Sequence, residues 1–294
     1  MRVPTPRLLQ FLLFVSLIGF VAAGTSFARD FEWNGGAATD DWQDGANWTD
    51  LGTGGADDGN WGIPDGTDTA LFPGGFSPTP TNMPGTVATV TIDVTGGNTV
   101  TLGDNLDTDN LSVLSGTLAT GANNLTVNTA ATVDGTLDAL GQAGAQSIGI
   151  TGNLGGTGTV TLGGGDLTVS GDATVTTLTG GGGAIDIDGS ATGTDFTESN
   201  TTTAVGGDLT VTNFTANGGT ITFDTTAGST VNGYTFNDVV VSANTTMGGN
   251  WTVGGSLDVD ATLDTNGNDL GVTTDVAGTG TVTGSAGTIT VGGT

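Results

Sequence analysis

Apolar and polar residues alternate one by one through most of the chain after residue 86. Two examples are residues 158–162, which read GTVTL, and residues 219–223, which read GTITF. Alternation with a period of two predicts short strands that bury one face. Gly, Asn and Asp separate the runs and predict turns. No convincing helical stripe occurs after the N-terminal segment, so the pattern predicts an all-β chain.

A fixed spacing organises these runs. The pentads NNLTV, GDLTV, GDLTV and GNWTV begin at Asn123, Gly165, Gly207 and Gly249, which are 42 residues apart each time. Repeats of this length are typical of stacked supersecondary units. We interpret 42 residues as two coils of a β-solenoid, which predicts about ten coils and a rod on the order of 50 Å long. An array of β-sandwich repeats is the alternative.

The chain divides into four zones. Residues 1–28 form a predicted signal peptide and residues 29–76 a predicted aromatic N-terminal cap. Residues 77–85 contain Pro78, Pro80 and Pro84 and predict an extended connector. Residues 86–294 hold the repeats.

The first zone has the features of a secretory signal. Arg2 and Arg7 precede an apolar run from Leu8 to Ala23, and the small residues Ser26 and Ala28 follow. The run is short for a membrane span of about 20 residues. We therefore expect a secreted protein that is extracellular or at the cell surface.

Composition narrows the function. The chain has 30 carboxylates and 3 arginines, and removal of residues 1–28 would leave Arg29 alone. Such a charge repels nucleic acid and anionic lipid, which bind through Lys and Arg. His, Cys and Lys are absent, which removes the usual nucleophile–base pairs and zinc sites. We expect no enzyme activity and assign no catalytic residue.

The aromatic zone carries a family resemblance. Residues 31–50 read FEWNGGAATDDWQDGANWTD, residues 61–72 read WGIPDGTDTALF, and residues 231–259 continue the repeat style with VNGYTFNDVVVSANTTMGGNWTVGGSLDV. These segments resemble the autotransporter-associated β-strand repeats of large bacterial surface proteins. The resemblance implies a right-handed parallel β-helix with a role in adhesion, coating or display. The sequence stops at Thr294 within a repeat, so we expect a fragment of a longer protein.

Aspartates provide the candidate metal ligands. Asp104, Asp107 and Asp109 lie in the run GDNLDTDN, and the aromatic zone holds a second group. The members of the second group are Asp57, Asp58, Asp65 and Asp68. Ca²⁺ binds oxygen ligands on a turning backbone. Calcium is therefore the one cofactor considered, and the alternative is that these aspartates only form turns.

Aromatic and hydroxyl residues provide the other candidates. Four tryptophans could form a sugar-stacking platform or a packed cap over the first coil, namely Trp33, Trp42, Trp48 and Trp61. Thr-x-Thr pairs such as Thr159 and Thr161 resemble the flat threonine arrays of ice-binding solenoids. The pairs do not recur at one coil spacing in the sequence, so we expect ordinary outward-facing strand residues.

Three functions remain open at this point. The first is a structural or adhesive surface protein, the stalk or passenger of an autotransporter-like protein, with host or environmental surfaces, glycans or copies of itself as partners. The second is a calcium-dependent matrix or surface-layer component. The third is a carbohydrate-binding or carbohydrate-active β-helix.

Overall fold

The computed structural model describes residues 28–52, 62–224 and 228–293. The predicted signal peptide lies outside the described residues except for Ala28, as do Asp57, Asp58 and Trp61. Among the residues described, no helix has the length and apolar character needed to span a membrane.

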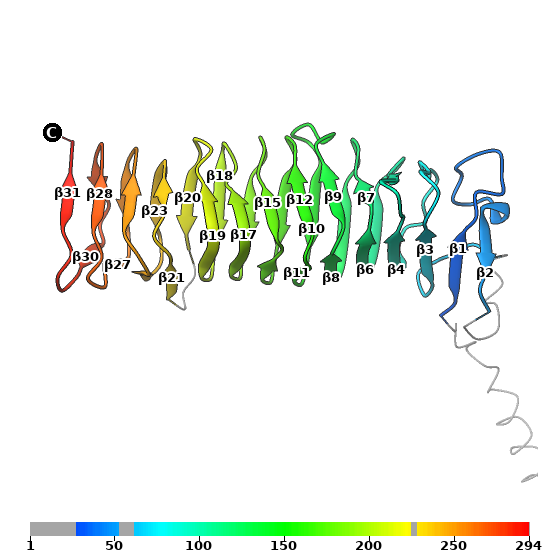
Figure 1. Cartoon of the computed structure of the whole chain (residues 1–294), viewed down its shortest axis with the longest axis horizontal. Helices are drawn as coiled ribbons and strands as arrows, with labels where there is room; N and C mark the ends of the chain where they lie inside the picture. The colour runs from blue at the N-terminus through cyan, green and yellow to red at the C-terminus, as the bar shows by residue number, and fades with distance from the viewer. Residues whose placement is uncertain (1–27, 53–61, 225–227, 294) are drawn as a thin grey trace, which may run out of the picture.

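The described chain is a β-solenoid of about 12 coils. The coils stack in one row from β1 (Asp30–Trp33), blue in Figure 1, to β31 (Ile289–Val291), red, and form an elongated rod. Pairing between coils is parallel throughout the described strands, except that β2 (Trp48–Asp50) runs antiparallel to β1. Parallel stacking confirms the expected solenoid and excludes the sandwich array.

The pairings sort the strands into three faces. Face 1 contains the first halves of β6 (Leu106–Ser115) and β8 (Leu125–Val133), then β10 (Ser147–Ile150), β13 (Asp166–Val169), β16 (Ile185–Ile187), β18 (Thr202–Val205), β20 (Thr220–Phe223), β23 (Asp238–Val241), β26 (Leu257–Val259) and β29 (Val276–Ala277).

Face 2 contains β1, β3 (Thr69–Pro73), β4 (Val87–Asp93), the second halves of β6 and β8, β11 (Leu154–Gly155), β14 (Ala173–Thr174), the first halves of β17 (Ala191–Thr197) and β19 (Leu209–Thr215), β21 (Ser229–Val231), β24 (Thr245–Met247), β27 (Thr262–Asp264) and β30 (Thr281–Thr283).

Face 3 contains β5 (Thr99–Thr101), β7 (Thr117–Ala119), β9 (Thr136–Ala139), β12 (Thr159–Leu162), β15 (Thr177–Thr179) and the second halves of β17 and β19. A separate four-stranded sheet follows on this side, made of β22 (Thr235–Phe236), β25 (Trp251–Val253), β28 (Leu270–Val272) and β31.

Coil length differs from the expected 21 residues. Paired residue numbers differ by 23 from Leu125 to Ile148, by 19 from Ile148 to Leu167 and by 18 from Leu167 to Ile185. Two coils of 18 leave six residues of the 42-residue repeat, which is one third of a coil. The repeat therefore advances to the next face: Leu167 lies on face 1, Leu209 on face 2 and Trp251 on face 3.

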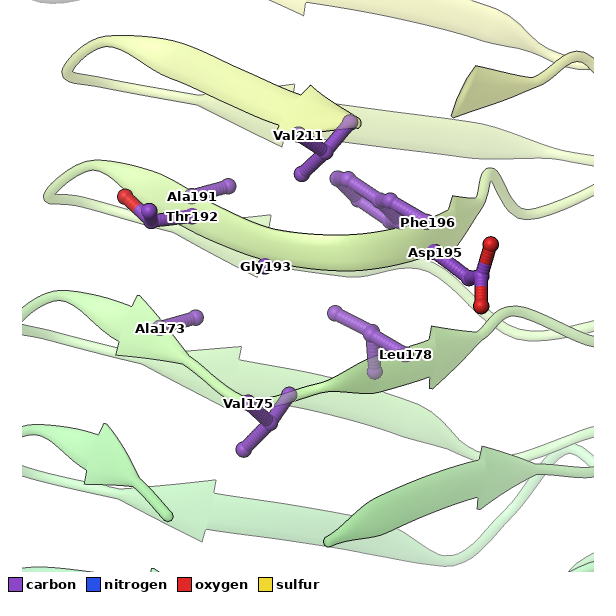
Figure 2. Close-up of a pocket in the computed structure, with 9 residues that line it drawn as sticks. All are labelled: Ala173, Val175, Leu178, Ala191, Thr192, Gly193, Asp195, Phe196 and Val211. Atoms are coloured by element: carbon purple, nitrogen blue, oxygen red, sulfur yellow. The ribbon is translucent and has the colours of Figure 1, made fainter. Parts of the chain in front are cut away.

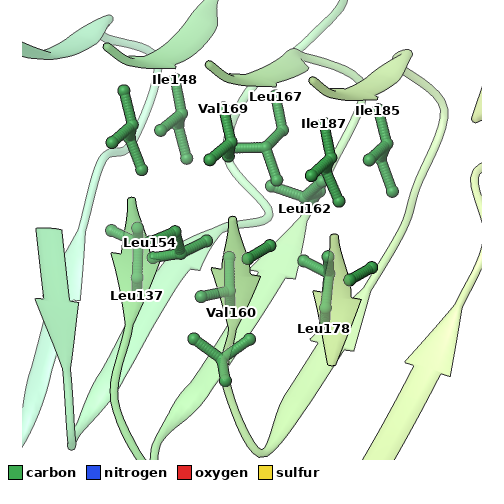
Figure 3. Close-up of a cluster of buried hydrophobic side chains, with 14 of the residues drawn as sticks. Leu137, Ile148, Leu154, Val160, Leu162, Leu167, Val169, Leu178, Ile185 and Ile187 are labelled. Atoms are coloured by element: carbon green, nitrogen blue, oxygen red, sulfur yellow. The ribbon is translucent and has the colours of Figure 1, made fainter. Parts of the chain in front are cut away.

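Inward side chains of the three faces form the core. Ladders such as Ile148, Leu167 and Ile185 run along the rod and are almost fully buried (Figure 3). Burial of each aliphatic side chain contributes about 1.5–3 kcal/mol. The polar residues between them point outward, which explains the alternation in the sequence.

Glycines let successive coils approach at the corners. At Gly156, φ is +123°, and an added Cβ would lie 2.1 Å from the carbonyl oxygen of Val133 in the preceding coil. A larger residue at this position would both strain the backbone and collide with backbone atoms.

The stack does not break at the zone boundaries of the sequence. β1 pairs with β3 and β3 with β4, so face 2 begins inside the aromatic zone. The Pro-rich stretch 77–85 is extended and hydrogen-bonded on both sides. Trp42 N donates to Thr81 O at 2.8 Å, and Gly103 N donates to Pro80 O at 2.9 Å.

We predict that Leu167→Ala lowers the free energy of unfolding by about 2–5 kcal/mol, because it leaves a cavity in the ladder. Thr168→Ala is the matched control, since this neighbour is exposed and should change the free energy by less than about 0.5 kcal/mol. Urea unfolding followed by circular dichroism measures both. Equal effects of the two substitutions would contradict the inward ladder.

Candidate functional site

Three of the four predicted sugar-stacking tryptophans are buried. Trp33 and Trp42 are 1% exposed and Trp48 is 5% exposed. Their ring centroids lie 4.8–5.0 Å apart in edge-on contacts with Trp48, and Phe72 packs against all three. Aromatic faces covered in this way offer no surface to a sugar ring.

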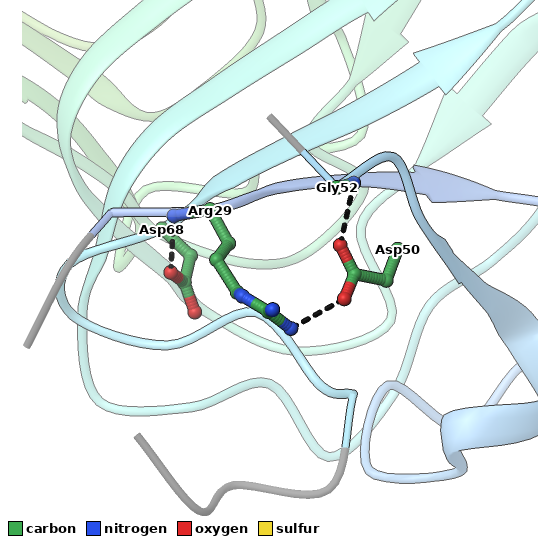
Figure 4. A network of polar contacts seen from close by, with 4 residues as sticks. All are labelled: Arg29, Asp50, Gly52 and Asp68. Atoms are coloured by element: carbon green, nitrogen blue, oxygen red, sulfur yellow. Dashed lines mark hydrogen bonds and ion pairs between the residues drawn. The ribbon is translucent and has the colours of Figure 1, made fainter. Parts of the chain in front are cut away.

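The tryptophan N–H groups are also used within the cluster. Trp42 Nε1 donates to Pro64 O at 3.2 Å, and Trp48 Nε1 donates to Trp42 O at 2.9 Å. Beneath β1, Arg29 forms an ion pair with Asp50, and its backbone N–H donates to Asp68 Oδ1 at 2.8 Å (Figure 4). The aromatic cluster and this polar network close the N-terminal end of the solenoid.

The predicted calcium ligands are separately engaged. Asp104 Oδ2 accepts from Asn82 N at 2.6 Å in the preceding coil. Asp107 and Asp109 both accept from Asn128 Nδ2, at 2.8 Å and 3.3 Å. Asp65 and Asp68 hold the turn between them, where Asp65 N donates to Asp68 Oδ2 at 3.2 Å.

Within the described ranges, no group of three or more acidic side chains is placed to hold a metal ion. A calcium ion at any of these aspartates would have to replace the N–H groups that the carboxylates already accept.

The aspartates instead join successive corners. Asn153 Oδ1 accepts from Asp172 N at 2.9 Å, and Asp172 Oδ1 accepts from Ser190 N at 2.8 Å. Ser190 Oγ accepts from Asp208 N at 3.1 Å, and Asp208 Oδ1 accepts from Thr230 N at 2.6 Å. We call these five residues the corner ladder. It supplies acceptors for turn N–H groups, which explains why Asp so greatly outnumbers Glu.

One carboxylate is buried. Glu198 follows β17, is fully buried, and accepts from Asn217 N at 2.9 Å through Oε1, while Oε2 has no hydrogen-bond partner. Burial raises the pKa of Glu198, and the backbone N–H groups of residues 217–219 lower it in part. Ser199 and Thr203 beside it are also buried, and Ser199 N donates to Thr203 Oγ1 at 3.0 Å.

A second acidic group lies on and beside face 1. Burial raises the pKa of Asp186, and the charges of Asp188 and Asp224 raise it further. Burial and the charge of Asp188 likewise raise the pKa of Asp224. These carboxylates repel one another, so they store electrostatic strain in the rod.

A hollow between faces 2 and 3 is too small for a substrate. It is lined by Ala173, Leu178, Phe196 and neighbouring residues and encloses about 10 Å³ (Figure 2). That volume admits about one water at most. The lining is almost wholly apolar and bears no arrangement of acid, base or nucleophile.

Face 3 carries a feature that sequence spacing did not reveal. Its outward threonines are in register between coils, contrary to the expectation that the Thr-x-Thr pairs do not recur. One column contains Thr99, Thr117, Thr136, Thr159 and Thr177. The numbers differ by 18, 19, 23 and 18, because coil lengths vary, and a search at one fixed period misses the match.

No protein-family model matches the chain, and neither a curated protein nor a solved structure matches it.

We predict that Asp172→Ala lowers stability by about 1 kcal/mol, because two consecutive turns lose one hydrogen bond between coils. Asp172→Asn keeps the Oδ1 acceptor and should lie close to the parent protein. Thermal melts of the three proteins test this difference. Identical melting of the Ala and Asn variants, with both below the parent, would show that charge rather than the acceptor matters.

We also predict that the melting temperature rises as pH falls from 7 towards 5. The pKa values of Glu198, Asp186 and Asp224 are raised in the folded state. The stability linked to them is fully present below their unfolded pKa values and is lost as pH rises through the folded ones.

Further acidification has the opposite effect at the corner below face 3. Hydrogen bonds from the backbone and hydroxyl of Thr157 lower the pKa of Asp134 beneath its ordinary value of 3.8. Its contribution is present above that value and is lost as pH falls through the folded pKa. The Glu198→Gln variant should show a smaller rise between pH 7 and 5, and an unchanged rise would contradict the role given to Glu198.

Proposed function

We propose that the chain is the rigid stalk or passenger portion of a secreted cell-surface protein, and that its role is structural or adhesive. The continuous stack of about 12 coils carries this proposal. At about 4.8 Å per coil, the stack extends roughly 60 Å. A rod of this kind holds whatever adjoins it at a fixed distance from a surface.

The contacts along the rod support a mechanical role. Each coil is hydrogen-bonded to the coils before and after it, and the core ladders run the whole length of the stack. Bending would break backbone hydrogen bonds on one face and compress side chains on another. The formal charge of −27 opposes unspecific clustering of rods in solution.

The site geometry favours this proposal over a carbohydrate-active β-helix. Cleavage needs two carboxylates across a substrate-sized cleft. The raised-pKa carboxylates are Glu198, whose side chain is buried, and the face 1 group, which lines no described hollow. The tryptophans suited to sugar stacking are inside the cap.

The geometry also favours it over a calcium-dependent matrix protein. The corner carboxylates already accept N–H groups from the adjacent coils, so the stack does not depend on added cations for these bonds. Asp238, for example, accepts from Ser256 N at 2.6 Å in the next coil.

Two measurements on residues 1–294 test the proposal. Biotinylation of intact cells should label the chain at the surface or in the medium, and a variant lacking residues 2–28 should stay inside the cell. Small-angle X-ray scattering of residues 29–294 should give an elongated particle about 60 Å long, with or without millimolar calcium. Retention of the full chain in the cytosol, or a rod that forms only with calcium, would overturn the proposal.

A further inference from the structure

Face 3 presents two parallel columns of outward threonines. The first column contains Thr99, Thr117, Thr136, Thr159 and Thr177. The second column contains Thr101, Ala119, Asp138, Thr161, Thr179, Thr197 and Thr215 in that order. The two columns are separated by one inward residue in each strand, such as Val160 in β12, which is fully buried.

The spacing of this threonine array is fixed by the backbone. Neighbouring threonines in a column are about 4.8 Å apart, and the two columns are about 6.7 Å apart, as i and i+2 positions of a strand. Because the inward residues of the same strands are packed in the core, the array cannot adjust its spacing to a partner. Only a partner with matching repeats can contact many threonines together.

The threonine hydroxyls are available to a partner. In the part of the chain that the structure describes, the Oγ1 atoms of these ten threonines form no hydrogen bond to another protein group. Their side chains are half-exposed, apart from the exposed Thr215. The corner aspartates differ in this respect, because their side chains are already hydrogen-bonded to adjacent coils.

The array is also nearly free of charge in a strongly acidic chain. The carboxylates within its columns are Asp138, which accepts from Leu140 N at 2.9 Å, and Asp195, which extends the first column and accepts from Asn213 Nδ2 at 2.8 Å. The outward positions of the columns bear no aromatic ring and no basic group.

We propose that the threonine array binds the surface of crystalline water. Ice is uncharged, rigid and periodic in two directions on the same length scale as the array. A threonine offers a hydroxyl that bonds to a lattice water and a methyl that occupies the space between waters. Each contact is weak, and simultaneous contact along two columns makes the attachment strong.

The chemistry of the array favours ice over other rigid surfaces. A mineral with exposed cations would need a dense row of free carboxylates, and the array has two that are already hydrogen-bonded. A crystalline polysaccharide presents flat sugar faces that suit aromatic rings, and the array has none. The interaction would add to the stalk role proposed above and does not depend on it.

The test measures incorporation of residues 29–294, fused to a fluorescent protein, into a slowly grown ice hemisphere. Thr159→Lys with Thr177→Lys places two charged, bulky side chains in the first column. Thr168→Lys with Thr222→Lys is the matched control on face 1, where the outward neighbours are Gly149, Asp186, Ala204 and Val240. Circular dichroism should show the same strand content in all three proteins.

We expect the parent protein and the face 1 control to enter the ice and the face 3 variant to enter at least about tenfold less, since avidity is lost. Failure of the parent to enter ice would overturn the proposal, as would equal entry of both variants. Sedimentation with crystalline cellulose, or dimers that the face 3 variant abolishes, would assign the array to a sugar surface or a second copy instead. The rod dimensions and surface labelling would be unaffected by any of these results.

Discussion

Hydrogen bonding between successive coils in parallel register is the constraint on which the rest of this structure depends. Once a coil is stacked, the position of every inward and outward side chain follows, because a shift of one residue would turn the apolar set to solvent. The core ladders, the corner ladder and the threonine array are three consequences of that one register. The end of the rod is a separate problem, and the aromatic cluster solves it by covering the first coil with buried rings.

Alternation predicted the strands and the inward residues well, since a period of two directly reports a half-buried strand. The solenoid also followed, because parallel stacking explains a long chain of short strands without disulfides. The 42-residue spacing was real, yet the inferred coil of 21 residues was wrong. Turn insertions such as the one before Ile148 lengthen single coils, and no local pattern reports how the chain closes upon itself.

The candidate sites were harder to predict for a related reason. Asp104, Asp107 and Asp109 are close in sequence, but their oxygens accept hydrogen bonds from different parts of the adjacent coils. Conversely, Thr99 and Thr177 are far apart in sequence and belong to one column. Which residues lie side by side depends on the summed lengths of all intervening coils, and that sum was not available from the alternation itself.

The mismatch between the 42-residue repeat and the 18-residue coil has a consequence for how such a rod can grow. Duplicating the unit adds two coils and a third, so each copy places its equivalent residues on the next face, as Leu167, Leu209 and Trp251 show. Growth by duplication therefore spreads any one sequence motif evenly around the rod. A face with its own chemistry must then arise by separate substitutions, coil by coil, against the averaging effect of the repeat.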